Sequence, residues 1–486
     1  MTDDARAATA SLLRRTMRRD RLPGVSVAVV DRDGIRYADG FGSRDLAGNR
    51  PATPETLYGI GSVTKSVTAL ALAQLQEAGM VAFDDPVRDY LDVDLGDDSD
   101  DPIRLHHLLS HSSGLPSLGT SEALIGRRLR RDTDTLPLAS TADFRAHIED
   151  AVGGGDRGES AVGGGDRDGG VVGGDAAARR EVVGSPGERF AYANAGYVLL
   201  GDVVEAVTGR PYDRYVAEHV LDPLGMERTT FDDMEFSMDD DHATVYLQED
   251  GDLVAASLPT RELSRPAGGL LASVSDLARY VRLFLDGGTV DGRTVVSGEA
   301  VDTLTEGRID TPSGPYGYGW RTRECCGYDL VGHSGSIAVS SAYVGFAPET
   351  GLGVVVAANA SPGYPLVRLG EGVFACAVGA DPQGAVPFFE RRRRFDRLTG
   401  EYTAYRGVKR GYVARDGGTL RLELAGPLGG ESLPLTESET DPYTFHTPND
   451  AGESVPVEFR VQDHEVNLLY DRWHLHKVAD EVVAPE

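Results

Sequence analysis

Ser62-Val63-Thr64-Lys65 lies at the start of a segment with a clear helical pattern. Apolar residues recur at intervals of three and four from Val67 to Ala78, and Gly79 ends the pattern. This spacing predicts a helix with Ser62 at its N-terminus. Positions i and i+3 of a helix share one face, so the side chains of Ser62 and Lys65 are expected to meet.

A serine and a lysine in this arrangement can form a nucleophile and its base. A serine hydroxyl reacts poorly until a neighbouring base removes its proton, and a lysine serves as this base where a desolvated pocket lowers its pKa. The helix N-terminus adds N–H groups beside the oxyanion that forms on an attacked carbonyl. Ser-x-x-Lys often arises by chance, but this chain contains only three lysines, Lys65, Lys409 and Lys477. The rarity of lysine favours a functional role for Lys65.

Two further segments carry polar groups at the ends of expected elements. Tyr192-Ala193-Asn194 precedes a helical pattern, and offers a phenol that can relay a proton and an amide that can hold a carbonyl. His333-Ser334-Gly335 ends an expected strand, where the glycine would let a substrate backbone lie against the strand edge. Taken singly, Tyr192 could be a packed aromatic residue, Asn194 a helix cap and His333 a core histidine.

Together, the motifs Ser62-x-x-Lys65, Tyr192-x-Asn194 and His333-x-Gly335 resemble, in this order, those of the penicillin-recognising serine hydrolases. That family comprises class C β-lactamases, D-peptidases and related esterases. The resemblance covers about residues 5–378 and implies an α/β (α+β) fold, in which an antiparallel sheet flanked by helices faces a mostly helical region across the active-site cleft. Three other stretches are similar to connecting segments of the family: 108–116, 222–226 and 267–279.

The resemblance implies a role for each catalytic residue. Ser62 would be the nucleophile that becomes acylated, and Lys65 the base or its electrostatic support. Tyr192 would act as a shared general acid and base. Whether Lys65 or Tyr192 takes the proton from Ser62 stays open, because two coupled groups need not permit a single assignment.

The implied binding residues lie around this centre. Asn194 would orient the substrate amide, and the N–H groups of Ser62 and Ser336 would form the oxyanion hole. Typical β-lactamases have Lys-Thr-Gly where this chain has His333-Ser334-Gly335, and an imidazole with a pKa near 6.5 is only partly charged at neutral pH. We therefore expect a serine hydrolase that acts on esters or small peptides, D-residue peptides included. A true β-lactamase and a catalytically idle binding relative remain alternatives.

The chain is strongly acidic. Its 48 Lys and Arg stand against 77 Asp and Glu, for a net charge of −29. This balance excludes a protein that binds nucleic acid through a basic surface. Abundant carboxylates with almost no lysine resemble the proteins of extreme halophiles. The acid-rich stretches 84–101 and 231–250 are interpreted as solvated loops and not as metal sites, and no metal or other cofactor is expected.

Composition divides the chain into a large hydrolase domain, 1–380, and a small β-barrel-like domain, 398–486, joined by a linker, 381–397. The small domain is similar to the lipocalin-like modules of some family members, and homo-oligomer formation is left open. Gly-rich repeats mark 151–179 as a flexible insertion. For the four consecutive arginines of the linker, Arg391–Arg394, ion pairing is preferred to a nucleic-acid contact.

The sequence also predicts a soluble cytoplasmic protein whose partner is a small-molecule or peptide substrate. It contains no apolar run of membrane-spanning length, and its N-terminal segment lacks the apolar core of a signal peptide. Its three cysteines, Cys325, Cys326 and Cys376, imply no disulfide framework.

Overall fold

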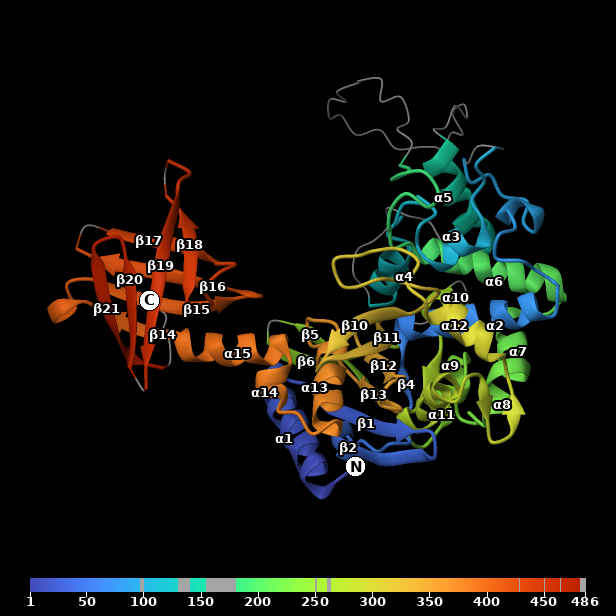
Figure 1. Ribbon diagram of the computed structural model, residues 1–486, viewed down its shortest axis with the longest axis horizontal. Coiled ribbons are helices and arrows are strands. Elements are labelled where there is room, and N and C mark those ends of the chain that lie inside the picture. The colour runs from blue at the N-terminus through green and yellow to red at the C-terminus, as the bar shows by residue number, and fades with distance from the viewer. Residues whose placement is uncertain are drawn as a thin grey trace, which may run out of the picture. The chain divides into compact units, whose positions relative to one another are not determined.

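A computed structural model of the chain divides into two compact units, residues 1–380 and 381–486. Each unit is described by itself (Figure 1). The structure describes residues 1–96, 100–129, 140–153, 181–249, 251–259, 264–427, 429–449, 451–463 and 465–480. The predicted Gly-rich insertion lies almost entirely outside these residues.

A seven-stranded antiparallel sheet forms the centre of the first unit, in the order β10-β11-β12-β13-β1-β2-β3. The N-terminal strand β1 pairs with the last strand of the unit, β13, so that Val27 lies opposite Val356. The strands are β1 Gly24–Asp31, β2 Gly34–Asp45, β3 Arg50–Pro51, β10 Arg321–Cys325, β11 Tyr328–Ser336, β12 Ser341–Ala347 and β13 Leu352–Ala358.

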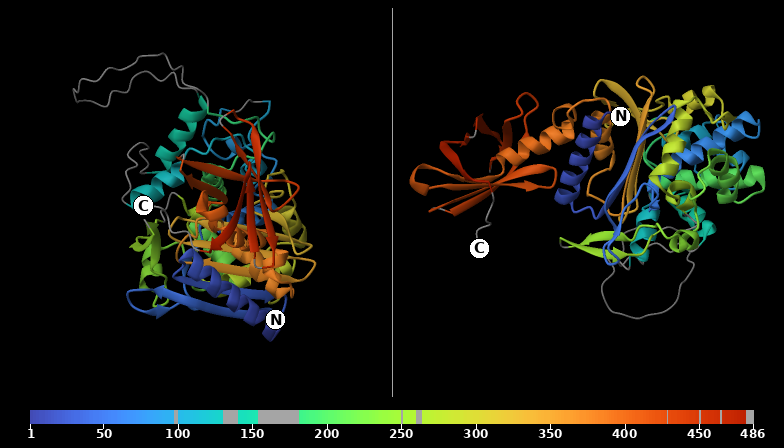
Figure 2. Two further views of the ribbon diagram at one scale, coloured as in Figure 1. Left: turned by 90° about the vertical axis from the view of Figure 1, so that its left-hand side faces the viewer. Right: turned by 90° about the horizontal axis from the view of Figure 1, so that it is seen from below.

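Helices cover both faces of this sheet. Figure 2 shows α1, Asp3–Asp20, and α13, Val367–Ala377, on one face, with the helical region on the other. On β12, the ring of Tyr343 lies against Gly370 of α13, whereas Phe346 stacks at 5.5 Å on Phe284 of the helix α11, Val274–Leu285. Every residue of β12 is buried. Burial on two faces explains why the central strands are continuous apolar runs.

Helix α2, Thr64–Glu77, runs through the core of the helical region and is buried from Thr64 to Ala73. The other helices of the unit are α3 Leu105–Leu109, α4 Thr120–Arg128, α5 Thr141–Gly153, α6 Asn194–Thr208, α7 Tyr212–Val216, α8 Asp222–Leu224, α9 Asp233–Met238, α10 Arg265–Gly268, α11 Val274–Leu285 and α12 Gly298–Thr305. Three short ribbons complete it: β4 Tyr58–Gly59 with β7 Leu271–Ala272, β5 Val245–Glu249 with β6 Asp252–Ala256, and β8 Thr289–Val290 with β9 Arg293–Thr294.

The sequence predicted a solvated loop for the acid-rich stretch 231–250, and the structure differs from this prediction. It contains helix α9 and strand β5. Asp232 caps α9, because its carboxylate accepts hydrogen bonds from the N–H groups of Met234 and Glu235. Acidic side chains stabilise a helix N-terminus, so the residues that indicated a loop initiate a helix here.

The second unit begins with two helices in the segment that was predicted to be a linker. These are α14, Pro382–Ala385, and α15, Pro387–Leu398. Each proline occupies the start of its helix, where a missing N–H costs nothing, and so does not break it. Arg391 and Arg394 of α15 both form ion pairs with Glu437 in the same unit, in agreement with the preferred interpretation of the arginine run.

The rest of this unit is a closed antiparallel barrel of strands β14 to β21, in which β14 pairs with both β15 and β21. Alternate residues point inward, as with Leu420 and Leu422 of β16 and Phe459 of β19. The strands are β14 Gly400–Thr403, β15 Arg410–Asp416, β16 Thr419–Gly426, β17 Gly429–Glu437, β18 Thr444–Pro448, β19 Ser454–Gln462, β20 Glu465–Tyr470 and β21 Trp473–Ala479.

The predicted fold class is therefore confirmed: an antiparallel sheet flanked by helices, a helical region and a small all-β domain. Among the helices of the described ranges, none combines the length and the apolar composition needed to cross a membrane.

Candidate active site

Ser62 lies in a short 3₁₀ turn, η1 (Gly61–Val63), which leads directly into α2. This turn packs against β11 at Gly335. A methyl group at Gly335 would lie 2.0 Å from the carbonyl oxygen of Ile60 and 2.6 Å from the amide nitrogen of Ser62. Glycine is thus required there so that the turn bearing Ser62 can approach the strand, which is a reason that the sequence did not indicate.

Lys65 is completely buried beside Ser62. Its Nζ lies 3.0 Å from Ser62 Oγ, 2.7 Å from Asn194 Oδ1 and 2.6 Å from the carbonyl oxygen of Ala267. These three acceptors are uncharged. Burial lowers the pKa of the Lys65 amine to about 7, and the charge of Glu122 opposes this shift. Near neutral pH a substantial fraction of Lys65 can therefore accept the proton of Ser62.

Tyr192 lies two residues before the start of α6, and its ring is close to the Lys65 amine. The centroid of the ring lies 5.0 Å from Lys65 Nζ. Burial raises the pKa of the Tyr192 phenol, and its hydrogen bond with Ser62 partly offsets this effect. The phenol therefore keeps its proton at neutral pH and can donate it.

His333 is buried on β11 and is neutral. Its Nδ1 lies 2.8 Å from the carbonyl oxygen of Ser334, an acceptor, so Nδ1 carries the proton. Its Nε2 then accepts the hydroxyl proton of Tyr316 at 3.0 Å. Burial, assisted by the charge of Lys65, lowers the pKa of His333 to about 3. The imidazole consequently supplies no positive charge where β-lactamases typically have a lysine.

The end of β11 offers backbone groups for binding. β10 pairs with β11 only up to Gly332, so one edge of residues 333–336 has no strand partner among the described residues. An extended substrate can pair with such an edge. Among the predicted binding residues, Ser334 differs in the direction of its side chain. It lies opposite Tyr343, whose ring faces α13. Directly opposed residues share a face, so the Ser334 side chain points away from the site.

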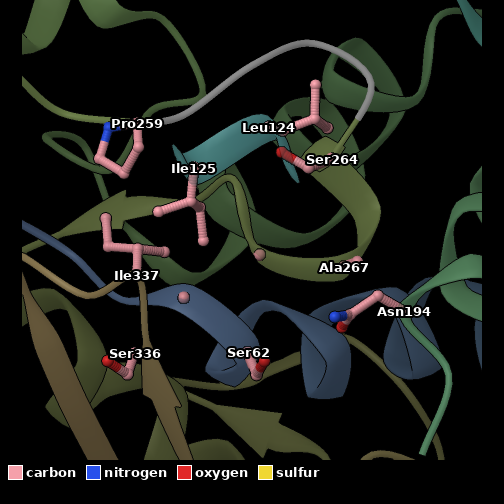
Figure 3. Close-up of a pocket in the computed structure, with 11 residues that line it drawn as sticks. Ser62, Leu124, Ile125, Asn194, Pro259, Ser264, Ala267, Ser336 and Ile337 are labelled. Atoms are coloured by element: carbon pink, nitrogen blue, oxygen red, sulfur yellow. The ribbon is translucent and has the colours of Figure 1, made fainter. Parts of the chain in front are cut away.

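A pocket of about 450 Å³, including space open to solvent, adjoins Ser62. Figure 3 shows Ser62, Asn194 and Ser336 approaching it from three elements, η1, α6 and β11. Apolar side chains form much of the remaining wall: Leu124, Ile125, Pro259 and Ile337. Ile125 and Pro259 lie across the pocket from Ser62 in Figure 3. The pocket therefore suits an uncharged, apolar group next to the nucleophile.

His111 was not predicted as a site residue, because the histidines of the sequence are not spaced as metal ligands are. It is 1% exposed, with a ring centroid 4.1 Å from that of Tyr192. Its Nδ1 accepts the N–H of Ala193 at 3.2 Å, and burial holds its pKa well below the usual value. Its φ of +56° is unusual for a residue with a side chain. The segment 108–116, which carried part of the family resemblance, was the available signal.

Known proteins are similar to both units of the chain. Residues 9–372 match the beta-lactamase family model, and residues 382–476 match that of the Pab87 octamerisation domain. The chain is similar to the octameric penicillin-binding protein homologue from Pyrococcus abyssi, at 33% identity and a TM-score of 0.83 over 96% of this chain and 99% of that one. A D-stereospecific amidohydrolase from Streptomyces sp. has the same fold, at 24% identity and a TM-score of 0.56 over 74% of this chain and 95% of that one.

Curated relatives match the first unit. Protein flp of Staphylococcus aureus (strain MW2) is 26% identical over 367 residues, which are 75% of this chain. The human putative beta-lactamase-like 1 is 27% identical over 373 residues, or 73% of this chain. The chain spans about 65% of the length of each. Because the family model matches most of the sequence and the homologue from P. abyssi matches nearly all of it, the chain belongs to the beta-lactamase family.

Proposed function

We propose that this protein is a serine hydrolase that forms an acyl-enzyme on Ser62 and acts on esters or small peptides, D-residue peptides included. One observation carries the proposal: the buried amine of Lys65, whose pKa is about 7, lies 3.0 Å from the hydroxyl oxygen of Ser62. A fully protonated surface lysine could not serve as a base at neutral pH.

In the acylation step, neutral Lys65 takes the proton of Ser62 as Oγ bonds to the substrate carbonyl carbon. The N–H groups of Ser62 and Ser336 stabilise the oxyanion. The bond to the leaving group then breaks, and the leaving atom receives the hydroxyl proton of Tyr192. The proton held by Lys65 then passes to the Tyr192 phenolate, so the pair is restored for the second half of the reaction.

In the deacylation step, water replaces the leaving group. Neutral Lys65 accepts one proton from the water as its oxygen bonds to the acyl carbon, and the same oxyanion hole stabilises the second tetrahedral intermediate. Collapse of that intermediate breaks the bond to Ser62 Oγ, which takes the hydroxyl proton of Tyr192, and the proton on Lys65 then restores the phenol. Asn194, which accepts a hydrogen bond from Lys65 and lines the pocket, can orient the substrate amide through its NH₂ group.

The test compares the wild-type protein with Ser62→Ala. Wild type is expected to be labelled by a fluorophosphonate and to hydrolyse a nitrophenyl ester, whereas Ser62→Ala should do neither. Equal turnover by both proteins, or no labelling of wild type, would overturn the proposal and favour a catalytically idle binding relative. Rapid nitrocefin turnover would instead identify a true β-lactamase, which the neutral His333 disfavours.

We propose in addition that the chain assembles into a homo-oligomer through its second unit. Support comes from the match of residues 382–476 to an octamerisation domain, and from the similarity of the whole chain to an octameric homologue. Light scattering on the full chain should give about eight times the mass of one chain. A monomer across the concentrations used in the assay would contradict this assignment.

We also propose that the protein works in the cytoplasm of a salt-adapted cell. Its net charge is −29, and nearly all of its positively charged residues are arginines. No disulfide joins its three cysteines, all of which lie within the described residues, and this suits a reducing compartment. Activity should therefore persist in molar salt, and loss of activity as salt rises would count against this assignment.

A further inference from the structure

Cys325 and Cys326 are consecutive thiols at the turn of the β10–β11 hairpin. Cys325 is the last residue of β10 and pairs with Tyr328 of β11, so Cys326 and Gly327 form a two-residue loop. Both loop residues have a left-handed backbone, with φ of +56° and +81°. A hairpin loop of this kind is a type I′ turn, in which asparagine, aspartate or glycine normally occupies the position of Cys326.

The left-handed backbone brings the two thiols together. Successive residues of a strand point to opposite faces of the sheet, which would keep neighbouring thiols apart. Cys326 departs from the strand, and its Sγ lies 3.9 Å from Sγ of Cys325. A cysteine in the left-handed region costs free energy that glycine would avoid. The chain has only three cysteines, so the contact of two of them at such a position favours a function for the pair.

The two thiols differ in their access to solvent. Cys325 is 5% exposed, and its Sγ lies 3.7 Å from the carbonyl oxygen of Glu371 on α13. Cys326 is partly exposed on the turn. A reagent from solution can therefore reach Cys326 first, and the adjacent Cys325 is in place to react second.

We propose that Cys325 and Cys326 are a site of reversible oxidation, at which a small disulfide from solution closes the pair into a disulfide between consecutive residues. The thiolate of Cys326 attacks one sulfur of the small disulfide, which forms a mixed disulfide and releases a first small thiol. Cys325 Sγ then attacks Cys326 Sγ, forms the bond between the two cysteines and releases a second small thiol. The pair loses two electrons and two protons, and the two released thiols take them up.

The bond that closes in this way is strained. Consecutive Cα atoms are about 3.8 Å apart across a trans peptide bond, whereas those of ordinary disulfides are about 4.4–6.8 Å apart. A strained disulfide is reduced easily, so an excess of a reducing thiol should return the pair to two thiols. In a reducing compartment the pair is therefore open, and it closes only when oxidised small thiols accumulate.

The test incubates the reduced full-length protein with excess glutathione disulfide at about pH 8.5, because burial raises the pKa of both thiols and the thiolate is the nucleophile. Mass mapping should show the loss of two of the three thiols. The peptide that contains residues 325–326 should lack two hydrogen atoms and carry no glutathione, and excess reduced glutathione should restore both thiols. A stable glutathione adduct in wild type, a bond between two chains, or no loss of thiols would overturn the inference.

Two variants separate the roles of the thiols. Cys325→Ala should stop the reaction at the mixed disulfide, so that glutathione stays on Cys326. Cys326→Asn suits the left-handed turn and should leave Cys325 unreacted, because Cys325 is buried. The control is Cys376→Ala on α13, which removes a thiol that is 1% exposed and should close the pair as wild type does. Reaction of Cys325 at the wild-type rate in Cys326→Asn would contradict this order of steps. If Cys325→Ala does not fold, wild type and Cys326→Asn decide the question.

Phenylarsine oxide measures the reduced pair independently. Its arsenic bonds to two neighbouring thiol sulfurs, and its oxygen leaves as water with both thiol protons. Wild type should bind it about tenfold or more tightly than Cys325→Ala or Cys326→Asn, because the second bond forms within one molecule. Prior oxidation should abolish this binding, and equal binding by wild type and both variants would overturn the inference. Ser62→Ala should behave as wild type in each measurement, so failure of the proposed hydrolase would leave this site untouched.

Discussion

Lys65 differs from the other two lysines of the chain in the partners of its amine. Lys409 has Glu431 at 3.6 Å and Lys477 has Asp480 at 2.6 Å. Lys65 instead contacts a hydroxyl, an amide oxygen and a backbone carbonyl, all without charge. A neighbouring carboxylate would hold the proton on the amine. Because none of these three hydrogen-bond partners is a carboxylate, burial can lower the pKa of Lys65.

This difference predicts how the rate depends on pH. The deprotonated amine is the base, so kcat/KM for a neutral ester should rise with pH through an apparent pKa of about 7, the value to which burial lowers Lys65. That apparent value belongs to the pair Lys65 and Tyr192. Lys65→Arg should remove the rise and slow acylation by about 100-fold or more, because a guanidinium does not release its proton.

The pH–rate profile of ester hydrolysis checks this expectation, with Lys409→Arg as the control. Lys409 has a carboxylate partner on the second unit, so its replacement by arginine should leave the profile as in wild type. A profile for wild type that is flat from about pH 6 to about pH 8 would contradict a role for Lys65 as the base.

His111 positions Tyr192 without touching the nucleophile. Its Nδ1 accepts the N–H of Ala193, and its ring packs on that of Tyr192. His111→Phe keeps a ring but leaves this N–H without its acceptor, at a cost of about 1–3 kcal/mol of stability. We expect kcat to fall by about tenfold or more while KM changes little, because the phenol is displaced and the pocket is not.

His111→Asn is the conservative variant. Asparagine tolerates the left-handed backbone at this position and keeps a polar acceptor, so it should recover part of kcat. Steady-state kinetics and thermal melts of both variants test the idea. Equal losses of kcat in the two variants, or a change confined to KM, would assign His111 a merely structural role.

At the scale of elements, the contact between η1 and β11 sets the geometry of the nucleophile. Gly335→Ala would place a methyl group 2.0 Å from the carbonyl oxygen of Ile60, and backbone atoms cannot yield cheaply. We expect the turn to shift, esterase activity to fall by about 100-fold, and the protein to lose about 1–3 kcal/mol of stability.

The control for this prediction is Gly298→Ala at the start of α12. The nearest atom to a methyl group there is the carbonyl oxygen of Gly287 at 3.6 Å, an ordinary contact. The variant should therefore fold and react as wild type. Activity and thermal melts of the two glycine variants decide the matter, and a fully active Gly335→Ala would show that the contact is dispensable.

Periodicity in the sequence predicted the elements that are buried on a regular pattern. Helices α2 and α6 and strand β11 lie where the sequence predicted a helix or a strand, because the regular burial of apolar residues specifies such elements. Helix α15 was missed, since its charged residues pair with Glu437, which lies far away in the sequence. Strands β14, β17 and β18 were missed as well, and in β17 few residues are buried.

The candidate site was predictable where a short motif carried the chemistry, and not where tertiary contact supplied it. Ser62, Lys65 and Asn194 meet as their motifs predicted. His111 gave no such signal on its own, because its place in the site comes from the ring of Tyr192 and the N–H of Ala193. The direction of Ser334 depended on strand pairing, which the motif does not specify.

At the scale of the whole molecule, the net charge of −29 predicts that stability depends on salt. Raising the ionic strength from about 0.1 M to about 1 M shortens the Debye length from about 10 Å to about 3 Å and screens repulsion among the carboxylates. The melting temperature should therefore rise by several degrees over this range. Sucrose at equal osmolarity is the control for non-specific exclusion, and a melting temperature that falls with salt would contradict the prediction.

The closed barrel of β14 to β21 has a consequence for assembly. In an open sheet the outermost strand exposes unpaired N–H and C=O groups, and another chain can extend the sheet by adding a strand. Closure through β14 and β21 removes the outermost strands, so the unpaired backbone is confined to short stretches such as β17 before Thr436, where β18 does not pair. Copies of the chain that associate through the paired parts of the barrel must therefore recognise side chains and loops. Such contacts can close into a ring of defined size, whereas strand addition would continue into a fibre.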